Sequence, residues 1–386
     1  MAQRRHRPVR HRRDQAPAQG AQTDQGARLT RRAPRARAAV ALGCALILSA
    51  CACAGLDLEP PARLPLAPTA PPPAPEQLTQ RLEALALNFD GKVGIAVEDI
   101  QDGWAAAFDG TTSYPQQSVA KLWVALAVFD AADRGQIGLA DPVVVHSADM
   151  SVFNQPMQKM LVDDAYATSI DGLLVWSLAQ SDNAANDILI RRLPTGAVQQ
   201  LINRRRLGPI RAGEPESLLE AKIAGLEWRA DYSFGRAFWD ARDQVPAALR
   251  QAKLDAYVAN PDDGATPIAI VQGLSRLKRG ELLSPTSTAR FLQIMQMAQT
   301  GPMRLKAGLA PGWDIAHKTG TGQDLADEST GYNDVGLLTA PDGRTYAVAV
   351  MIAATRKPVP DRQTLMADVA RAVVAQHDGG DETGGE

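Results

Sequence analysis

The chain has 386 residues, of which 45% are hydrophobic and 22% are charged, a composition ordinary for a globular enzyme. The formal charge of −2 hides an asymmetry, because residues 1–51 hold an excess of nine positive charges and residues 52–386 carry −11. The chain after residue 51 therefore has no basic excess, which argues against a nucleic acid as partner.

The basic N-terminal segment has the layout of a secretion signal. Its arginines end at Arg37, and an apolar run follows over residues 38–50 that is too short to span a bilayer permanently. Leu48-Ser49-Ala50-Cys51 resembles a bacterial lipobox, which would make Cys51 a lipidated first residue; cleavage near Ala52 is the alternative. We expect a signal peptide over 1–51, a Pro- and Ala-rich tether over 52–75, and an exported, periplasmic protein that meets the membrane only through its lipid.

Cysteines occur only at positions 44, 51 and 53, within or beside this leader. The remaining chain can have no disulfide framework, no thiol nucleophile and no thiolate metal site. It also lacks the clustered ligands of a zinc hydrolase, so we expect no metal and no cofactor.

The main domain is expected over residues 76–378, with a polar tail over 379–386. Helical periodicity covers residues 77–87, and apolar runs at 92–98 and 104–108 flank a hairpin signal, Gln101-Asp102-Gly103. The region from 118 to 299 is predicted to be mainly helical, although 210–262 shows no clear pattern. Strands return at 313–319, 334–339 and 345–352, before a terminal helix over 362–376. This order predicts an α+β fold, with one antiparallel sheet from both chain ends, flanking helices and an inserted all-helical region.

The most informative stretch is Ser118 and the run after it, which is apolar almost all round until Asp130. Such a run predicts a buried central helix. Lys121 follows Ser118 by one turn on the same face. A buried lysine tends to lose its proton, and a neutral amine beside a serine hydroxyl can act as its base. The alternative is that Ser118 only caps the helix while Lys121 extends to solvent.

Two further motifs each have a structural explanation when taken alone. Ser181-Asp182-Asn183 separates the expected helices 170–180 and 184–192, where it would serve as an N-cap. Lys318-Thr319-Gly320 lies on an apolar strand, where the lysine could protect a sheet edge. A second Ser-x-x-Lys motif, Ser275 to Lys278, lies in a charged segment, and we interpret it as a solvated helix face.

In combination and in this order, the three motifs are the set described for class A β-lactamases and penicillin-binding proteins. The chain resembles the class A-like serine hydrolases of that superfamily from about Glu76 to Gln376. The resemblance includes Gly280-Glu281-Leu282-Leu283-Ser284 and the Gly312-Trp313 that precedes Lys318.

The resemblance implies catalytic roles for four residues. Ser118 would be the acylated nucleophile and Lys121 its proton acceptor. Ser181 would relay a proton to the leaving nitrogen, and Asn183 would hold the substrate amide and Lys121.

The resemblance also implies a strand that binds the substrate. Lys318 would supply positive potential near the substrate carboxylate, Thr319 would hydrogen-bond that carboxylate, and Gly320 would let the substrate approach closely. The N–H groups of Ser118 and Thr321 would form the oxyanion hole. The family's arginine on the following strand is not evident, since Asn333 and Asp334 stand there.

The second half-reaction is where the sequence departs from the family. Class A enzymes use a Glu-x-x-x-Asn loop after Ser-Asp-Asn, and residues 211–220 contain no such pair. Glu216 is the best-placed candidate for the deacylation base and Glu214 the second; Glu220 takes the usual Asn position. Solvated loop carboxylates are the alternative.

The surplus relative to ordinary class A chains lies around residues 228–263. This segment holds six of the 19 aromatic residues, at helix-like spacing: Trp228, Tyr232, Phe234, Phe238, Trp239 and Tyr257. Such residues are expected to form a local core, or alternatively a lid over the substrate cleft.

Three functional classes follow. The favoured one is hydrolysis of a small-molecule β-lactam, by a protein expected to be a monomer. A D-Ala-D-Ala peptidase acting on peptidoglycan-like peptides, or a related amidase or esterase, is the alternative, and a non-catalytic binding protein is a third. A Ser-His-Asp triad would depend on His146 or His317, and neither has a nucleophile elbow beside it.

Overall fold

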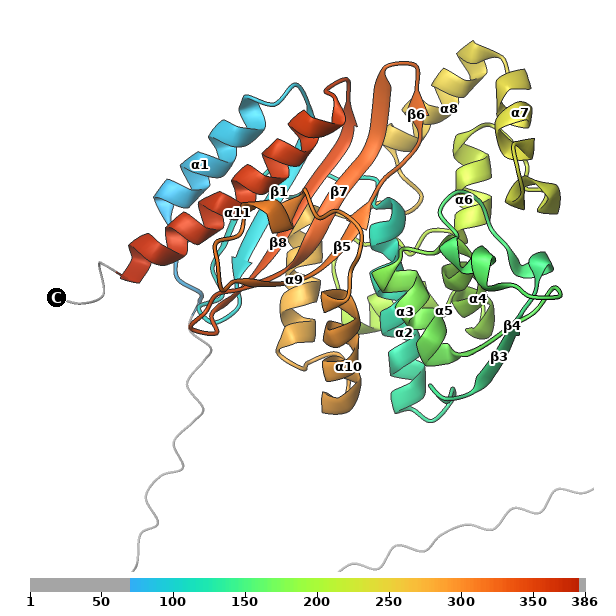
Figure 1. The fold of residues 1–386 in the computed structure, drawn as a ribbon. Coiled ribbons are helices and arrows are strands. Elements are labelled where there is room, and N and C mark those ends of the chain that lie inside the picture. The colour runs from blue at the N-terminus through green and yellow to red at the C-terminus, as the bar shows by residue number, and fades with distance from the viewer. Residues whose placement is uncertain (1–69, 382–386) are drawn as a thin grey trace, which may run out of the picture. The chain divides into compact units, whose positions relative to one another are not determined.

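The computed structural model describes residues 70–381 (Figure 1). The expected signal peptide, Cys51 and most of the Pro-rich tether lie outside these residues. Within the described part of the chain, no helix is both long and apolar enough to cross a membrane.

A six-stranded antiparallel sheet forms the base of the domain. Its strand order is β2-β1-β8-β7-β5, with the short β6 paired to β7. The N-terminal strand β1 pairs with the C-terminal strand β8, so strands from both chain ends form one sheet, as predicted. The Gln101-Asp102-Gly103 signal does join a hairpin, in which Glu98 lies opposite Ala105. The strands are β1 (Gly91–Asp99), β2 (Ala105–Phe108), β5 (Asp314–Gly320), β6 (Asp324–Leu325), β7 (Glu328–Thr339) and β8 (Thr345–Thr355).

Helices cover both faces of this sheet. The terminal helices α1 (Glu76–Leu87) and α11 (Val359–Asp381) pack together on one face, while α9 (Pro267–Lys278) packs on the other (Figure 1). Strand β8 is consequently buried along almost its whole length, which explains why it reads as a continuous apolar run. Helix α11 continues to Asp381, past the expected start of the polar tail.

The inserted region packs against the β5 edge of the sheet. Its central helix α2 (Lys121–Asp133) is buried from Lys121 to Ala131, as the apolar run predicted. Around α2 lie α3 (Ile170–Ala179), α4 (Asn183–Arg192), α5 (Ala197–Arg205), α6 (Glu216–Ile223) and α10 (Pro285–Gln296).

The insertion is not entirely helical, because β3 (Pro142–Val145) and β4 (Tyr166–Ser169) form a small antiparallel ladder. The buried Val143 and Val145 alternate with exposed neighbours, a period-two pattern. Four residues are too few for that pattern to stand out within a mainly helical segment.

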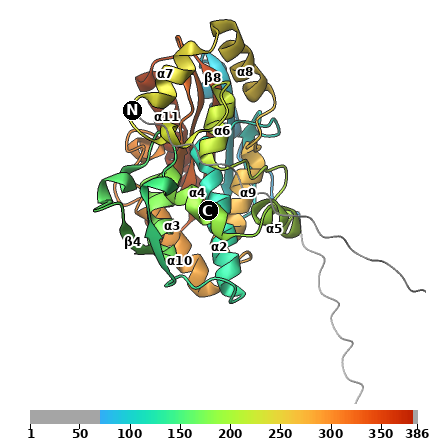
Figure 2. The same cartoon turned by 90° about the vertical axis from the view of Figure 1, so that its right-hand side faces the viewer.

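The segment that the sequence left unassigned is also helical. After α6 come a 3₁₀ turn at Ala230–Ser233, α7 (Ala237–Gln244) and α8 (Ala247–Ala259). Figure 2 shows α7 and α8 together at the upper end of the domain, away from α10.

Candidate active site

Ser118 lies in a 3₁₀ turn, Gln117–Ala120, that leads directly into α2. The preceding Gln117 has a φ of 53°, an uncommon conformation for a residue with a side chain. Two interactions hold it there: Asp263 Oδ2 accepts from the Gln117 N–H at 2.6 Å, and Gln117 Nε2 donates to the Tyr257 hydroxyl at 2.6 Å. The buried aspartate and tyrosine, neither of which the sequence singled out for this purpose, thus fix the turn that carries Ser118.

The Lys121 amine lies at the centre of the site and is fully buried. Its Nζ donates to Ser118 Oγ at 2.9 Å, to the Ser181 carbonyl at 2.8 Å and to Asn183 Oδ1 at 2.6 Å. Glu216 Oε1 is 3.3 Å away. The sequence suggested an apolar setting for this amine, whereas the structure surrounds it with oxygen atoms that can hydrogen-bond an ammonium.

The Ser181-Asp182-Asn183 segment serves both purposes that its sequence allowed. Asp182 is the helix cap: its carboxylate accepts from the N–H of Ala185 at 2.8 Å and from that of Met157 at 2.7 Å. Ser181 and Asn183 face the site instead, with Asn183 Nδ2 bound to the Val152 carbonyl at 2.9 Å. One loop therefore caps α4 and presents two side chains to Lys121.

The Lys318-Thr319-Gly320 motif ends β5, which is an edge strand of the sheet. Lys318 is nevertheless fully buried, and its Nζ donates to Ser181 Oγ at 2.8 Å, so it does not protect an exposed edge. Burial and the positive charge of Lys121 hold the pKa of Lys318 well below its usual range. Thr319 Oγ1 lies 2.7 Å from Thr300 Oγ1.

Gly320 is required by a close approach of protein rather than of substrate. A Cβ at this position would lie 2.4 Å from the carbonyl oxygen of Gln116, next to the nucleophile turn. The missing side chain therefore lets β5 approach the Ser118 turn closely enough to place Thr321 beside it.

Arg304 is a site residue that the sequence did not reveal. Its guanidinium donates to Thr321 Oγ1 at 2.7 Å and to the Gly320 carbonyl at 2.9 Å, and it lies 3.8 Å from the centre of the Tyr332 ring. A loop that precedes β5 thus brings a guanidinium to the end of the strand that carries Lys-Thr-Gly. No motif marks it, because only the fold brings that loop to the strand end.

The two loop carboxylates differ sharply in environment. Glu216 begins α6 and is 5% exposed, facing Lys121, whereas Glu214 is exposed and lies 3.8 Å from Lys222. Glu216 is held by its backbone: Asp187 Oδ1 accepts from the Glu216 N–H at 2.7 Å and Oδ2 from the Ser217 N–H at 3.1 Å. Asp187 lies one turn after Asn183 on α4, a spacing that could have suggested it.

Two other sequence expectations concern residues outside the site. Ser275 is fully buried on α9, so the interpretation of its motif as a solvated face is wrong for the serine, although Lys278 is exposed. His317 lies in β5 with its Nδ1 2.9 Å from Asp334 Oδ1. Because successive residues of a strand point to opposite faces, His317 faces away from Lys318 and its partners.

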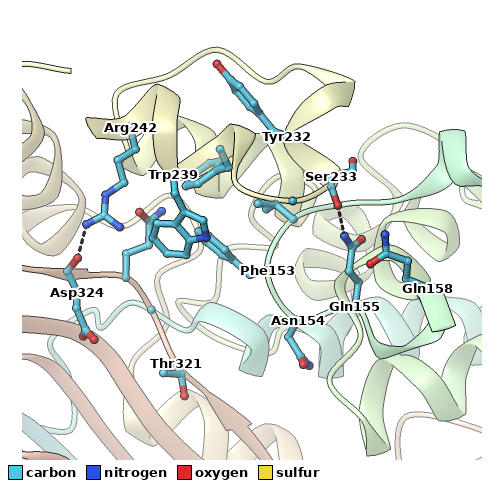
Figure 3. A pocket seen from close by; sticks show the side chains of 15 residues that line it. Phe153, Asn154, Gln155, Gln158, Tyr232, Ser233, Trp239, Arg242, Thr321 and Asp324 are labelled. Atoms are coloured by element: carbon cyan, nitrogen blue, oxygen red, sulfur yellow. Dashed lines mark hydrogen bonds between the residues drawn. The ribbon is translucent and has the colours of Figure 1, made fainter. Parts of the chain in front are cut away.

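A cavity of about 780 Å³ adjoins the site, and Thr321 lies on its wall (Figure 3). Four aromatic residues line it: Phe153, Tyr232, Phe238 and Trp239. The rings of Phe153 and of Trp239, which belongs to α7, lie 5.1 Å apart. Arg242 lines the cavity beside the Trp239 ring. Tyr232 and Phe238 belong to a small local core and also line the cavity, as Trp239 does. Tyr257 packs in a separate apolar cluster, and Phe234 is exposed.

This geometry can be compared with known proteins. A sequence profile of the β-lactamase enzyme family matches residues 77–377, most of the chain. The chain belongs to this family. It is 27% identical over 296 residues to the extended-spectrum β-lactamase PER-1 of Pseudomonas aeruginosa, covering 76% of this chain and 85% of that protein. It is also 27% identical over 305 residues to a β-lactamase of Bacteroides uniformis, with 77% and 90% covered.

Solved β-lactamase structures agree with the fold. The crystal structure of the TLA-3 extended-spectrum β-lactamase matches with a TM-score of 0.65 at 25% identity, covering 78% of this chain and 98% of that one. The predicted α+β architecture is confirmed, and this member of the β-lactamase family is a serine hydrolase.

Proposed function

We propose that this protein hydrolyses β-lactams through an acyl-enzyme on Ser118. The observation that carries the proposal is the convergence on one buried amine, Lys121 Nζ, of Ser118, Ser181, Asn183 and Glu216. Such an arrangement offers a nucleophile, a route for its proton and a carboxylate for a water molecule.

Acylation would begin when Lys121 passes a proton to Glu216 and takes the Ser118 proton in its place. Ser118 Oγ then attacks the lactam carbonyl carbon, and the N–H groups of Ser118 and Thr321 stabilise the oxyanion. Lys121 returns a proton through Ser181 Oγ, 3.5 Å from its Nζ, to the leaving nitrogen, and the C–N bond breaks. Glu216 then gives its proton back to Lys121.

Deacylation would use Glu216 as general base. The carboxylate takes a proton from a water molecule, whose oxygen attacks the ester carbon. The ester C–O bond then breaks as Ser118 Oγ takes a proton from Lys121, and Glu216 gives its proton to Lys121 in turn. The buried position of Glu216 beside Lys121 supports this role, and the exposed position of Glu214 does not.

Substrate binding would use the end of β5 and the adjoining cavity. The substrate carboxylate would face Lys318, Thr319 and the Arg304–Thr321 pair, where the Arg304 guanidinium supplies positive charge. The acyl side chain would extend into the cavity bounded by Phe153 and Trp239.

We also propose that the protein is exported, anchored by lipid at Cys51, and active as a monomer. The lipobox-like sequence and the Pro-rich spacer support the anchor. A single acyl chain binds membranes only marginally, so stable anchoring needs the several chains of a bacterial lipoprotein.

The deciding experiment is a nitrocefin assay with purified protein, followed over many turnovers. Continued hydrolysis at a constant rate is expected. A stoichiometric burst that then stops, with a persistent acyl-enzyme in intact-mass spectra, would instead identify a penicillin-binding peptidase or related hydrolase.

A further inference from the structure

Two short basic runs that the proposed catalysis does not use meet on the face of the sheet that α9 covers. Residues 204–206 are three consecutive arginines at the end of α5, and residues 276–279 hold three cations at the end of α9. Arg276 Nη1 donates to the carbonyl of Arg205 at 2.7 Å and to that of Arg206 at 3.3 Å, so the two helix ends lie side by side (Figure 2). Positive charge is therefore concentrated where they meet.

The two basic runs border a small pocket of about 280 Å³. Three arginines line it, Arg206, Arg276 and Arg279, together with one acidic residue, Glu98 of β1. Gly103, in the turn between β1 and β2, also forms part of the wall. The lining thus has an excess of positive charge, as expected for a site that attracts an anionic group.

The arginines of this pocket keep hydrogen-bond donors for a ligand. Glu281 accepts from Arg276 Nε at 3.0 Å and from Arg279 Nε at 2.7 Å, which orients both guanidinium groups. Each guanidinium has five N–H donors in a planar fork, so donors remain after these bonds are made. Arg206 is exposed and forms no ion pair within residues 70–381. Since guanidinium groups bind phosphate oxygens in pairs of hydrogen bonds, a phosphate group matches this lining.

The Pro-rich segment enters the domain beside the pocket. A Cβ at Gly103 would lie 3.5 Å from the Cβ of Pro71, near the start of the described residues. Pro71 is 20 residues after Cys51, a separation that the chain can extend to at most about 70 Å. A lipid on Cys51 would therefore keep the pocket near the bilayer surface, at the millimolar effective concentration typical of a short linker.

The pocket lies at the edge of the sheet opposite the candidate active site. Strand β2, which contributes Ala105 to the pocket, is one edge strand, and β5, which carries Lys318, is the other. Four strand spacings separate these two edges, about 19 Å across the sheet. A membrane bound at the β2 edge would therefore leave the Ser118 side open to substrate.

We propose that this pocket binds the phosphate of an anionic phospholipid headgroup in the membrane that holds Cys51. The inference rests on the lipid anchor proposed above. Arg206, Arg276 and Arg279 would donate to the phosphate oxygens, while the anchor supplies most of the attachment. An arginine near an anionic bilayer contributes roughly fivefold to binding, so the pocket would orient the tethered domain rather than hold it by itself.

The test is vesicle flotation with the soluble full-length Cys51→Ala protein, which lacks the lipid. Vesicles of phosphatidylcholine alone are compared with vesicles in which one third of the lipid is phosphatidylglycerol. Binding should require phosphatidylglycerol and weaken as salt is added. Adding Arg206→Ala and Arg279→Ala together should weaken binding about 25-fold, and Arg206→Ala alone about fivefold. Because Arg206 is exposed and unpaired within residues 70–381, the single variant tests the pocket even if the double variant is unstable.

Arg229→Ala with Arg236→Ala is the matched control, since it removes the same charge from exposed positions of the 228–263 insertion. This control should bind like its parent, and circular dichroism should show every variant folded. Equal binding to both kinds of vesicle, or an equal loss in the control, would overturn the inference. Inorganic phosphate bound by these arginines without any vesicle binding would also overturn it, because the ligand would then be a free anion.

The outcome is independent of the proposed function. The chains compared carry no lipid, and flotation does not measure hydrolysis. Release of wild type and Cys51→Ala alike from cell membranes would refute the anchor and leave headgroup binding by the arginines measurable. A confirmed anchor would not rescue the inference if phosphatidylglycerol made no difference.

Discussion

Lys121 Nζ and Glu216 Oε1 lie 3.3 Å apart, which links the central helix α2 to the loop helix α6. In the proposed mechanism, the groups that acylate Ser118 and the candidate deacylation base would share one proton route through this contact. The two half-reactions can still be separated, because the carboxylate is needed as a base only when water attacks.

Replacing Glu216 with glutamine should leave acylation within about tenfold of wild type and stall deacylation. General-base assistance is worth roughly 10²- to 10⁴-fold, so a stoichiometric burst should precede a far slower steady state. Intact-mass spectrometry should detect the trapped acyl-enzyme. Glu214→Gln is the matched control, since Glu214 is exposed; a stall in that variant instead would mean that the wrong carboxylate has been assigned.

Ser118, and not Ser275, should be labelled by a fluorescent penicillin. Ser118→Ala should lose the label and on the order of 10³-fold or more in hydrolysis rate. Ser275→Ala should keep both, because the Ser275 hydroxyl is buried without a hydrogen-bond partner among the described residues, and its removal costs little. Label surviving in Ser118→Ala would refute the nucleophile assignment.

Trp239→Ala should selectively impair the hydrolysis of β-lactams that carry large aromatic side chains. Loss of the ring that faces Phe153 should cost about 1 to 2 kcal/mol of substrate binding, roughly a tenfold rise in KM. A β-lactam with a small side chain should be unaffected. Phe234→Ala is the control, since Phe234 belongs to the same insertion but does not line the cavity. Equal effects on both substrates would argue against the side-chain assignment.

Asp263 should make the protein less stable as the pH rises from about 4 to about 7. Burial raises the pKa of Asp263 from 3.8 to about 7, so Asp263 ionises at a lower pH in the unfolded chain than in the folded protein. Ionising it in its buried site lowers the free energy of unfolding. The stabilising contribution of the neutral Asp263 side chain is complete below the pKa of Asp263 in the unfolded chain. It is lost as the pH rises through the pKa of Asp263 in the folded protein. Urea unfolding from about pH 4 to about pH 7 should show that the free energy of unfolding falls less steeply in Asp263→Asn than in wild type. Asp262→Asn, which alters a half-buried neighbour paired with Lys222, should show the same decline with pH as wild type.

Cys51→Ala should release the protein from membranes if Cys51 carries the lipid. Fractionation of cells that make each form would place wild type with the membranes and the variant in the soluble fraction. Equal release of both forms would exclude the anchor and favour ordinary signal cleavage near Ala52.

The sequence alone determined that the run after Ser118 forms a buried helix. Lys121 begins this helix and Ser118 lies in the turn that leads into it. A run with no polar face can only be buried, so local periodicity was sufficient. The positions of most strands along the chain could be predicted for the same reason, since their apolar runs and the Asp102-Gly103 turn are local features. The two four-residue strands of the insertion were missed because so short a period-two pattern is weak.

Only the tertiary structure decided which loop groups belong to the site. Glu214 and Glu216 are alike in sequence, and they differ because Asp187 binds the Glu216 backbone and turns that carboxylate toward Lys121. Arg304 reaches the end of β5 from a loop that no motif marks. The raised pKa of the buried Glu220 likewise depends on burial and on charges from other elements. No local sequence pattern encodes the sum of those long-range contacts.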